Sequence, residues 1–325
     1  MKRINNLFER IIEIENLYIA YQKAKQGKSK QYGIKLFDRD FENNIYNIQK
    51  ELISGIYQTS KYGIFMIHDP KERTVYRLPF RDRIVHHAIM NILEPIWTSI
   101  FISNSYSCIK GRGIHGVLKH LKRDLKDSEN TIYCLKFDIR KFYPSIDHEI
   151  LKQIIRKKIK DDRLLGLLDE IINSAPGVPI GNYLSQYFAN LYLSYFDHWI
   201  KEDKQVKYYY RYADDIVILN KDKAYLHALL SDIENYLNEK LKLRLKNNYQ
   251  IFPVDVRGID FVGYVFRHRY IRMRKSIKKN FARKSAKLNK KDINTKDYKQ
   301  QLCSWTGWAK HCDSKNLVKK LMKYE

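Results

Sequence analysis

The sequence predicts an α+β fold, because segments with helical and strand patterns are mixed without a regular alternation of the two. Apolar residues recur with the spacing of one helix face in residues 4–26, 41–53, 82–93, 148–159, 163–172, 183–200 and 225–241. Residues typical of strands are concentrated in 62–68, 74–78, 131–137, 208–220 and 258–266. Only 13 Gly and 7 Pro interrupt 325 residues, so these elements should follow one another closely.

The N-terminal part is expected to hold two helices, one hairpin and a third helix. The second helix ends at the turn signal Ser54-Gly55. The two strand segments that follow are separated by Asp69-Pro70, a dipeptide that favours a turn, so they should pair as a hairpin. The third helix begins near Asp82 and should stop at Pro95, because proline disrupts a helix interior.

The remaining elements surround two strand segments that carry acidic residues. Residues 131–137 are rich in strand-forming residues and lead directly into Asp138. Three predicted helices follow, residues 148–159, 163–172 and 183–200, of which the last is long and rich in aromatic residues. They precede the second strand segment with acidic residues, 208–220. There, Asp214 and Asp215 have apolar residues on both sides, which predicts a hairpin that displays the acids at its tip. A further helix and a last strand follow.

Positive charge dominates the composition and is concentrated near the C-terminus. The chain has 61 Lys and Arg against 36 Asp and Glu, a formal net charge of +25. Residues 267–325 contain 19 basic and 4 acidic residues, which favours a nucleic acid as the partner. Trp305 and Trp308 lie in this segment and are candidates for stacking on bases. Their three-residue spacing on a helix slightly favours packing against the core instead.

No zinc site, disulfide framework or membrane span is predicted. The cysteines are widely spaced, form no CxxC pair and lack histidines at ligand spacing: Cys108, Cys134, Cys303 and Cys312. The N-terminus has no apolar leader segment, and no run approaches the roughly 18 apolar residues that a membrane helix needs. We therefore expect a reduced chain in the cytoplasm.

Three carboxylates carry the strongest indication of chemistry. Asp138 follows one strand segment, and Asp214 and Asp215 interrupt another. Acids at strand ends can converge at one edge of a sheet, where they repel one another strongly unless cations lie between them. Carboxylate oxygens select Mg²⁺ or Mn²⁺, and two such ions roughly 3.5–4 Å apart support in-line phosphoryl transfer. The alternative is that the adjacent acids are hydrated residues of an ordinary turn.

At these positions the sequence resembles the reverse transcriptases. Residues 212–215, Tyr-Ala-Asp-Asp, match their YxDD box, and residues 137–148 match the block that supplies the first metal-binding Asp. Further blocks occur in the family order over most of the chain: 71–87, 104–115, 241–246 and 258–264. The resemblance implies an RNA-directed DNA polymerase that copies template RNA into cDNA from a primer and dNTPs, using two Mg²⁺ or Mn²⁺ ions.

The same resemblance implies a right-hand fold in three regions. Residues 1–130 would form an N-terminal extension and the fingers, with palm contributions near 74–95. Residues 131–266 would form the palm, which holds an antiparallel sheet and the catalytic carboxylates. Residues 267–325 would form a basic helical thumb that holds template and primer.

Residue by residue, the resemblance implies a metal site and substrate contacts. Asp138 and Asp214 would ligate both ions, Asp215 would support the site, and the Ile139 carbonyl would complete one coordination shell. The nucleotide would be contacted by Lys71, Arg73, Tyr143, Ile180, Gly181 and Lys246. Primer and template would be contacted by Gly263, Tyr264, Trp305 and Trp308.

Three of these assignments have alternatives. The resemblance assigns residues 71–87 to the fingers, where their basic side chains would approach the triphosphate, but Arg83 in that block can instead pair with its neighbour Asp82. The Tyr143 ring would clash with a ribose 2′-OH and so select dNTPs, or it is a core aromatic beside Phe142. Lys246 would approach the leaving group, or it is one of many surface lysines.

One block narrows the resemblance. Most reverse transcriptases have QGxxxSP where this chain has Ile180-Gly-Asn-Tyr-Leu-Ser-Gln186, a form similar to that of the diversity-generating retroelement group. Resemblance to that group implies copying errors opposite template adenines, with Ile180 and Gln186 as the residues that set fidelity. It also implies a partner, the accessory variability determinant protein, which is a small basic oligomer. The alternatives are another prokaryotic reverse transcriptase, in phage defence or a retron, and a catalytically silent RNA-binding scaffold. The intact acids argue against the scaffold.

Overall fold

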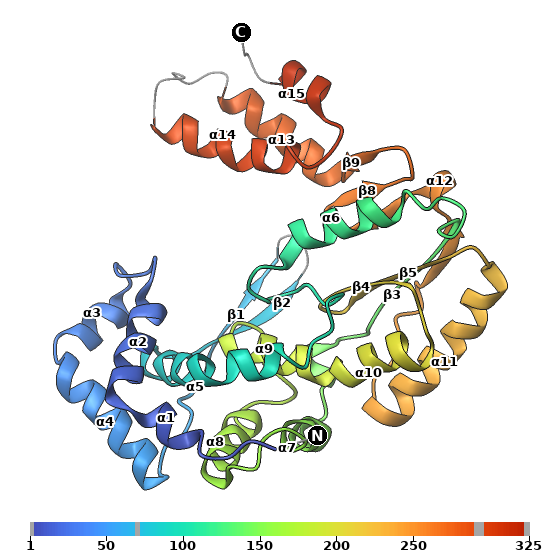
Figure 1. Ribbon diagram of the computed structural model, residues 1–325. Coiled ribbons are helices and arrows are strands. Elements are labelled where there is room, and N and C mark those ends of the chain that lie inside the picture. Colours follow the sequence, from blue (N-terminus) through green and yellow to red (C-terminus); the bar gives the residue numbers. More distant parts are fainter. Residues whose placement is uncertain (1–2, 69–71, 289–295, 322–325) are drawn as a thin grey trace. The chain divides into compact units, whose positions relative to one another are not determined.

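The structure is a computed structural model, and it describes residues 3–68, 72–288 and 296–321 (Figure 1). The chain divides into two compact units, each made of three stretches of sequence. We call the first the helical unit; it takes the chain as far as Ser103, then Ile139–Trp199 and Asn235–Arg244. The second, the sheet unit, takes Asn104–Asp138, Ile200–Glu234 and the chain from Leu245 onward.

The N-terminal helices of the helical unit pack around one long helix. They are α1 (Phe8–Ile12), α2 (Ile14–Lys25), α3 (Tyr32–Asp38), α4 (Phe41–Ser54) and the long α5 (Phe80–Thr98) (Figure 1). The single helix predicted over residues 4–26 is wrong in detail, because Glu13 leaves the helical conformation with ψ of 134° and separates α1 from α2. The turn predicted at Ser54-Gly55 is confirmed: Gly55 has φ of +70° and ends α4.

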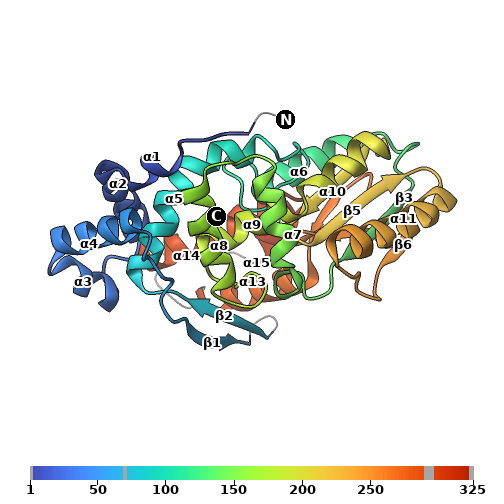
Figure 2. The same ribbon diagram turned by 90° about the horizontal axis from the view of Figure 1, so that it is seen from below.

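The predicted N-terminal hairpin is confirmed. Strands β1 (Gly63–Ile67) and β2 (Arg73–Arg77) pair antiparallel in the helical unit and form a two-stranded ribbon (Figure 2). Every residue of β1 is exposed. Pro95 does not stop α5, which continues to Thr98.

Four helices complete the part of the helical unit that follows Asp138. They are α7 (His148–Arg156), α8 (Asp162–Asn173), α9 (Tyr183–Tyr192) and α10 (Ser194–His198). The carboxylate of Asp161 caps α8 through the Leu164 N–H and also accepts from the Leu7 and Phe8 N–H groups. The predicted long helix over 183–200 is interrupted at Leu193 and passes into a π-helical turn at Trp199–Asp203.

The main sheet of the sheet unit is antiparallel, with strand order β4-β5-β3-β6. Its strands are β3 (Tyr133–Asp138), β4 (Tyr208–Tyr212), β5 (Asp215–Asn220) and β6 (Gln250–Pro253). Helix α6 (Gly113–Asp124) covers one face with Val117, Leu118 and Leu121, and α11 (Lys223–Leu241) follows β5 (Figure 1). The predicted hairpin within 208–220 is therefore confirmed, whereas β6 and α6 were not predicted.

A second, smaller sheet joins the C-terminal helices. It consists of β7 (Ile259–Phe261), β8 (Tyr264–Phe266) and β9 (Ile271–Met273), preceded by α12 (Val254–Arg257). Helices α13 (Lys275–Leu288), α14 (Lys296–Ala309) and α15 (Lys315–Leu321) follow (Figure 1). The one strand predicted over 258–266 is two strands, because Val262 and Gly263 form a turn with φ of +44° and +91°. No helix among the described residues has the length and apolarity to cross a membrane.

Candidate active site

The three predicted carboxylates meet at one end of β3 and β5. Asp138 is the last residue of β3, and Asp215, the first residue of β5, lies directly opposite it in the antiparallel register. Asp214 precedes Asp215 in the two-residue loop that joins β4 to β5. Because the register places Asp138 and Asp215 opposite each other, their side chains point to the same face of the sheet. The expected convergence of acids at a sheet edge is confirmed.

The alternation of side chains along β3 explains why these acids lie at the boundary of a buried face. Cys134, Lys136 and Asp138 share one face, and Cys134 is buried in the core under α6. Toward the end of the strand the same face becomes polar, with the side chains of Lys136 and Asp138 only partly covered. The carboxylates are therefore anchored on a rigid, buried strand while their oxygens stay accessible.

Asp138 is held by Lys246. The Lys246 Nζ donates to Oδ2 of Asp138 at 2.6 Å, and the Lys246 backbone N–H donates to the Asp138 carbonyl at 2.9 Å. Oδ1 of Asp138 is buried and accepts no hydrogen bond among the described residues. The sequence assigned Lys246 to the nucleotide; in this structure it neutralises part of the charge of Asp138.

Asp214 lies within interaction range of Asp138, and this proximity changes its acidity. Burial, and then the negative charge of Asp138, raise the pKa of the Asp214 carboxyl above its ordinary value. Two ionised carboxylates have only acceptors to offer each other, so the pair is stable when it shares a proton or when a cation lies between them. The two carboxylates therefore form a negatively charged site, in which Oδ1 of Asp138 accepts no hydrogen bond from the described residues.

Asp215 is in a different environment, with a lysine beside it. Burial raises its pKa to about 6, although the ammonium group of Lys136 acts in the opposite direction. The Lys136 Nζ lies 3.3 Å from both carboxylate oxygens but donates only to Oδ2, so the buried Oδ1 accepts no hydrogen bond from the residues that the structure describes. The side chain of Asp215 keeps 31% of its surface exposed, which leaves room for a further ligand.

Lys136 also connects the carboxylates to the second sheet. Its Nζ donates to the backbone carbonyl of Asp260 in β7. The Asp260 side chain in turn accepts from Nε of Arg274 at 2.6 Å. Lys136 was not predicted as a site residue; its position two residues before Asp138, on the same face of a predicted strand, was the available signal.

A second residue that the sequence analysis missed is Arg211, which is fully buried in β4. Its Nη1 donates to the Ala213 carbonyl at 3.1 Å, and its Nη2 donates to Ser105 Oγ at 3.2 Å. Ala213, the first loop residue of the hairpin, has φ of +54°, a region that a side chain bearing Cβ rarely adopts. The guanidinium of Arg211 therefore supports the strained turn that carries Asp214.

The donor set at this site fits a hard divalent cation. Carboxylate oxygens are the preferred ligands of Mg²⁺, and the orphaned Oδ1 atoms of Asp138 and Asp215 are buried acceptors that a cation would satisfy. Within the described parts of the chain, no three His, Cys, Asp or Glu side chains gather closely enough to enclose an ion by themselves. A metal here would therefore need backbone, water or substrate oxygens to complete its shell, as Mg²⁺ usually does.

Part of the predicted nucleotide site lies together in the helical unit. The Tyr76 N–H of β2 donates to the Ile180 carbonyl at 2.8 Å. Gly181 has φ of +117°, and a Cβ at this position would lie 2.6 Å from the Tyr76 carbonyl oxygen, so this close approach requires glycine. Arg73 is exposed on the same strand as Tyr76. Lys71 lies outside the described residues.

The other predicted residues of the helical unit differ in exposure. Ile139 is buried, Gln186 is exposed on α9, and Tyr143 is half-buried in a short 3₁₀ turn. The ring of Tyr143 packs edge-on against the buried Phe142 with ring centres 5.5 Å apart. Tyr143 is therefore a neighbour of the core without being enclosed by it.

The predicted primer and template residues form one packed cluster in the sheet unit. The Trp308 ring lies against Gly263, where a Cβ would be 2.6 Å from the indole, and the Tyr264 hydroxyl donates to the Trp308 carbonyl at 3.0 Å. Tyr264 is buried, and Trp305 stacks on the buried Phe281 with ring centres 5.5 Å apart. Both tryptophans are partly exposed, and each packs one face on the core, as their spacing indicated.

The predicted alternative for Arg83, an ion pair with Asp82, does not form. The buried Asp82 accepts from the Tyr57 hydroxyl at 2.8 Å and from the Ser60 N–H. Arg83 instead donates to the Ala24 carbonyl at 3.0 Å.

Comparisons with known proteins show the family of the chain. Residues 68–266 match the family model described as "Reverse transcriptase (RNA-dependent DNA polymerase)". Protein YkfC of Escherichia coli K12 is 28% identical over 276 residues, which cover 70% of this chain and 71% of that protein. The group II intron-encoded protein LtrA of Lactococcus lactis is 26% identical over 215 residues, 61% of this chain but only 35% of its own length.

A solved structure is similar in fold. Telomerase from Candida albicans, solved with a fragment of telomeric RNA, superposes with a TM-score of 0.51 at 12% identity over 74% of this chain and 55% of that one. The predicted α+β class and right-hand polymerase fold are thereby confirmed. Because the family model covers more than half of the sequence and includes all three carboxylates, the chain belongs to the reverse transcriptase family of RNA-dependent DNA polymerases.

Proposed function

We propose that this chain synthesises cDNA on a template RNA, and that Asp138, Asp214 and Asp215 are its catalytic residues. The observation that carries the proposal is the meeting of these three acids at the end of β3 and β5, where two buried oxygens accept no hydrogen bond within the described part of the chain. An ordinary hydrated turn would not bury carboxylates beside one another, because desolvation and repulsion both destabilise such an arrangement.

Divalent metal ions complete the proposed chemistry, as reverse transcriptases generally use them. Asp138 and Asp214 would hold two Mg²⁺ or Mn²⁺ ions, Asp215 would support the site, and the Ile139 carbonyl would add a ligand. When bound, the ions would activate the primer 3′-hydroxyl and stabilise the departing pyrophosphate. Lys246 and Lys136 balance the carboxylate charge and would remain available to orient the oxygens.

The substrate contacts are proposals of the same kind. Lys71 and Arg73 would bind the triphosphate, Tyr143 would exclude ribonucleotides, and Ile180 with Gly181 would contact the nascent base pair. The contact between Ile180 and β2 supports this, because it joins two of these segments. Primer and template would run over Gly263, Tyr264, Trp305 and Trp308, beside the basic helices of the C-terminal region.

We further propose that the enzyme serves a diversity-generating retroelement in the cytoplasm of a bacterium or of a phage's host. It would make errors opposite template adenines and would work with a small basic accessory protein oligomer. Support comes from the block Ile180–Gln186, in which an apolar side chain replaces an amide. A second candidate is a role with an intron or a related bacterial element, which the similarity to the intron-encoded LtrA favours.

Primer extension on a defined RNA with Mg²⁺ tests the polymerase. Wild-type protein should incorporate dNTPs, and Asp214→Ala should lose activity by at least about a hundredfold, because removing a metal-binding carboxylate removes transition-state charge stabilisation. Asp203→Ala, which removes an exposed acid of the same unit, is the matched control and should retain activity. Equal incorporation by Asp214→Ala and wild type would contradict the assignment.

Sequencing the same products by template base separates the retroelement role from the intron role. Errors concentrated opposite adenine would support the first, and an even error spectrum would favour the second. Ile180→Gln should reduce misincorporation opposite adenine, since it restores a side-chain amide at this position. If the error spectrum of Ile180→Gln equals that of wild type, the fidelity assignment is wrong.

A further inference from the structure

The loop that joins α8 to α9, residues 174–182, is held at both ends by one tyrosine. Tyr62 precedes β1, and its hydroxyl lies 2.7 Å from the Ser174 hydroxyl at the start of the loop. The Asn182 amide, at the end of the loop, donates to the same tyrosine hydroxyl at 3.4 Å. The loop therefore has a fixed position beside the β1–β2 ribbon.

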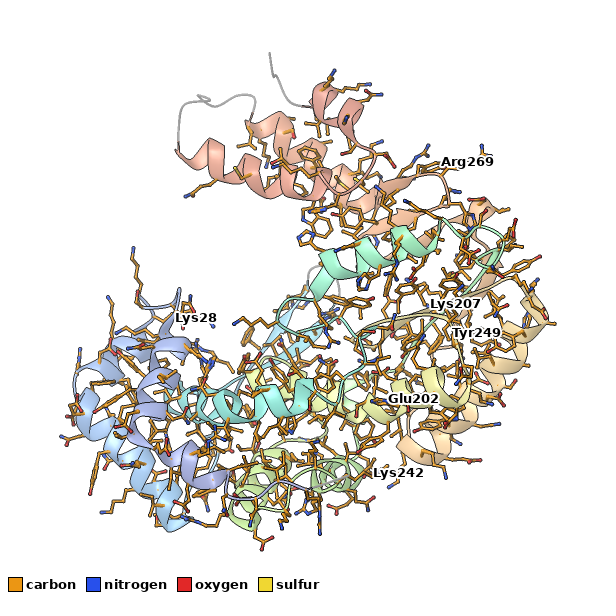
Figure 3. The ribbon with its side chains drawn as sticks, viewed as in Figure 1. Lys28, Glu202, Lys207, Lys242, Tyr249 and Arg269 are labelled. Carbon is orange, nitrogen blue, oxygen red and sulfur yellow. The ribbon has the colours of Figure 1, made fainter. Side chains whose placement is uncertain are left out.

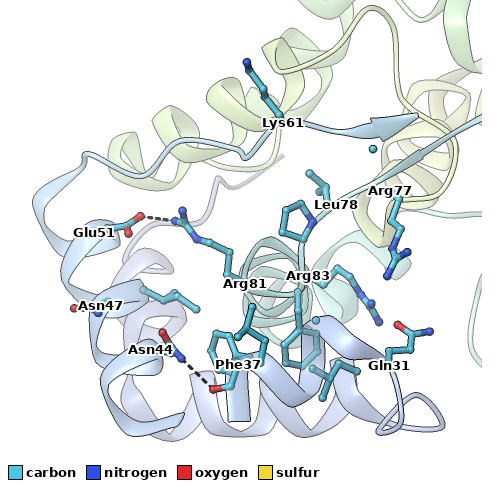
Figure 4. Close-up of a pocket in the computed structure, with 17 residues that line it drawn as sticks. Gln31, Phe37, Asn44, Asn47, Glu51, Lys61, Arg77, Leu78, Arg81 and Arg83 are labelled. Carbon is cyan, nitrogen blue, oxygen red and sulfur yellow. Dashed lines mark hydrogen bonds and ion pairs between the residues drawn. The ribbon is translucent and has the colours of Figure 1, made fainter. Parts of the chain in front are cut away.

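The two faces of this ribbon have different neighbours. Arg77 lines a pocket of about 610 Å³ on one face (Figure 4). Tyr76 points to the opposite face, because side chains alternate along a strand, and its ring packs edge-on against Tyr62 with ring centres 5.7 Å apart. The pocket belongs with residues 71–87, already assigned to the triphosphate, whereas the face with the two tyrosines holds the 174–182 loop.

The turn that carries Tyr143 is short and locally strained. It is a 3₁₀ turn of three residues, and Lys141, just before it, has φ of +45°. Pro144 follows Tyr143, and a residue before proline disfavours helical backbone angles. Contacts from other segments must therefore hold the Tyr143 ring in one position.

The middle of the 174–182 loop supplies such contacts. The Val178 N–H donates to the Tyr143 carbonyl at 2.9 Å. Gly177 has φ of +60°, and a Cβ at this position would lie 2.6 Å from the carbonyl oxygens of both Tyr143 and Pro144. The loop backbone thus packs directly on the backbone of the turn, and this close approach requires glycine.

His148, the first residue of α7, fixes the Gly177 carbonyl. Its Nε2 lies 2.7 Å from that oxygen, and a carbonyl oxygen only accepts, so the imidazole donates. The start of α7 is itself anchored, because Asp147 accepts from the Ile150 N–H and pairs with Lys242 at 2.6 Å (Figure 3). His148 therefore ties the 174–182 loop to the helix that follows the Tyr143 turn.

We propose that Gly177 and His148 are positioning residues for sugar selection. They fix the Tyr143 turn and so set how closely the Tyr143 ring approaches the 2′ position of the nucleotide. This role depends on the proposed function, in which that ring excludes ribonucleotides. Exclusion by a clash changes steeply with distance, and such groups must be held within roughly 0.5 Å of their working positions.

Primer extension opposite template guanine, with dCTP or CTP, measures sugar selection as the ratio of the two kcat/KM values. His148→Phe keeps a ring but removes the donor, and should lower the preference for dCTP by about two- to tenfold, as expected for one lost hydrogen bond. His148→Gln restores an N–H donor and should keep the wild-type ratio. His198→Phe is the matched control and should also keep it, because His198 Nε2 lies 2.8 Å from the Ile100 carbonyl in the same unit, outside the turn and the loop.

A second pair of variants separates contact with the turn from backbone strain. Gly177→Ala forces the loop away from the Tyr143 and Pro144 carbonyls and should lower the preference for dCTP by at least about fivefold, because the turn is displaced. Gly55→Ala is the control, since Gly55 has φ of +70° but no described atom within 4 Å of a Cβ. Both substitutions should lower the melting temperature, and only Gly177→Ala should change sugar selection.

Tyr143→Ala distinguishes failure of the positioning role from failure of the proposed function. It should admit CTP and lower the preference for dCTP more than Gly177→Ala or His148→Phe does. A wild-type ratio in active Tyr143→Ala would show that Tyr143 does not select the sugar. A lower ratio for Tyr143→Ala, with wild-type ratios for Gly177→Ala and His148→Phe, would overturn the positioning role alone. Equal losses in His148→Phe and His198→Phe would also overturn it.

Hydrogen exchange tests the structural step without catalysis. In His148→Phe, amides of residues 174–182 should exchange about two- to tenfold faster than in wild type, with Val178 as the reporter, whereas His148→Gln and His198→Phe should exchange as wild type does. Unchanged exchange in His148→Phe would show that the imidazole does not hold the loop. Faster exchange with an unchanged sugar ratio would show that the loop does not set selection, and either result would overturn the proposal.

Discussion

At the scale of single residues, the site is a balance between carboxylates that repel and lysines that compensate. Asp138 faces Asp215 across the β3–β5 pairing, and like charges at directly opposed positions destabilise a sheet. Lys246 and Lys136 each neutralise one of these acids. Burial and the negative charge of Asp138 raise the pKa of the loop residue Asp214, and the charge of Lys246 opposes them only in part.

Replacing Asp214 should therefore stabilise the metal-free protein at neutral pH. The folded state raises the pKa of Asp214, so between the unfolded and folded pKa values the native chain binds more protons, and its stability falls as pH rises. Well below the ordinary pKa of 3.8 the carboxyl is protonated in both states and the penalty disappears. Thermal unfolding of Asp214→Asn in EDTA should show a higher melting temperature than wild type at pH 7.5 and a much smaller advantage at pH 4. An advantage of the same size at both pH values would contradict this cause.

A lysine bound to a metal-binding carboxylate competes with the metal. Because Lys246 occupies Oδ2 of Asp138, Lys246→Met should lower the Mg²⁺ concentration at which thermal stabilisation is half complete, by about two- to fivefold. Lys242→Met is the matched control, since Lys242 forms an ion pair of the same 2.6 Å length with Asp147 in the helical unit. An unchanged Mg²⁺ midpoint for Lys246→Met would show that the lysine does not compete with the metal, and a higher midpoint would show that it assists metal binding.

At the scale of elements, two tight hairpins position the functional residues. The β4–β5 loop sets Ala213 at positive φ, and Arg211 holds its carbonyl. The β7–β8 loop sets Val262 and Gly263 at positive φ, and Trp308 lies on the glycine. The β4–β5 loop is thus supported from its own strand by Arg211, which Ser105 holds in turn, whereas the β7–β8 loop is supported by Trp308 from a distant part of the chain. Both contacts fix a strained conformation that the loop sequence alone would not favour.

Gly263→Ala should destabilise the sheet unit by about 1–3 kcal/mol, because an added Cβ both disfavours the positive φ and overlaps the Trp308 ring. Gly307→Ala is the control, since Gly307 lies within α14 with no atom within 4 Å of a Cβ. That substitution should be neutral or stabilise by up to about 1 kcal/mol. Chemical denaturation measures both; equal effects would show that the Trp308 contact can give way.

Short-range patterns in the sequence predicted the β1–β2 and β4–β5 hairpins, because alternation and turn residues are local signals. The division of residues 258–266 into two strands was missed, since Val262 is a strand former and only its contact partners force positive φ. The contact of Lys136 with Asp260, 124 residues later, and the burial of Arg211 depend on tertiary packing that no window of sequence contains. The three carboxylates could be predicted because their chemistry demands acids at strand ends.

At the scale of the whole molecule, positive and negative charges are concentrated in different segments, which the net charge alone does not reveal. The chain carries +25, yet its sheet unit concentrates acids at one strand end and cations in the C-terminal helices. Helix α13 has exposed Lys278 and Lys279, with no ion pair to either among the described residues. Such unpaired cations bind counterions in the free protein and would exchange them for phosphates.

Binding of a primer–template duplex should therefore weaken steeply with salt. Each phosphate that a lysine contacts releases about one counterion, so the slope of log affinity against log salt changes by roughly 0.7–0.9 per contact. Lys278→Gln/Lys279→Gln should reduce the magnitude of that slope by between one and two, as measured by fluorescence anisotropy. Lys221→Gln/Lys223→Gln removes two exposed charges beyond the end of β5 that is remote from Asp215, and should leave the slope unchanged. Equal slopes for both double variants would mean that the positive charge of α13 attracts nucleic acid only at long range. A reduced slope for the α13 variant alone would identify α13 as a surface that binds the phosphate backbone directly.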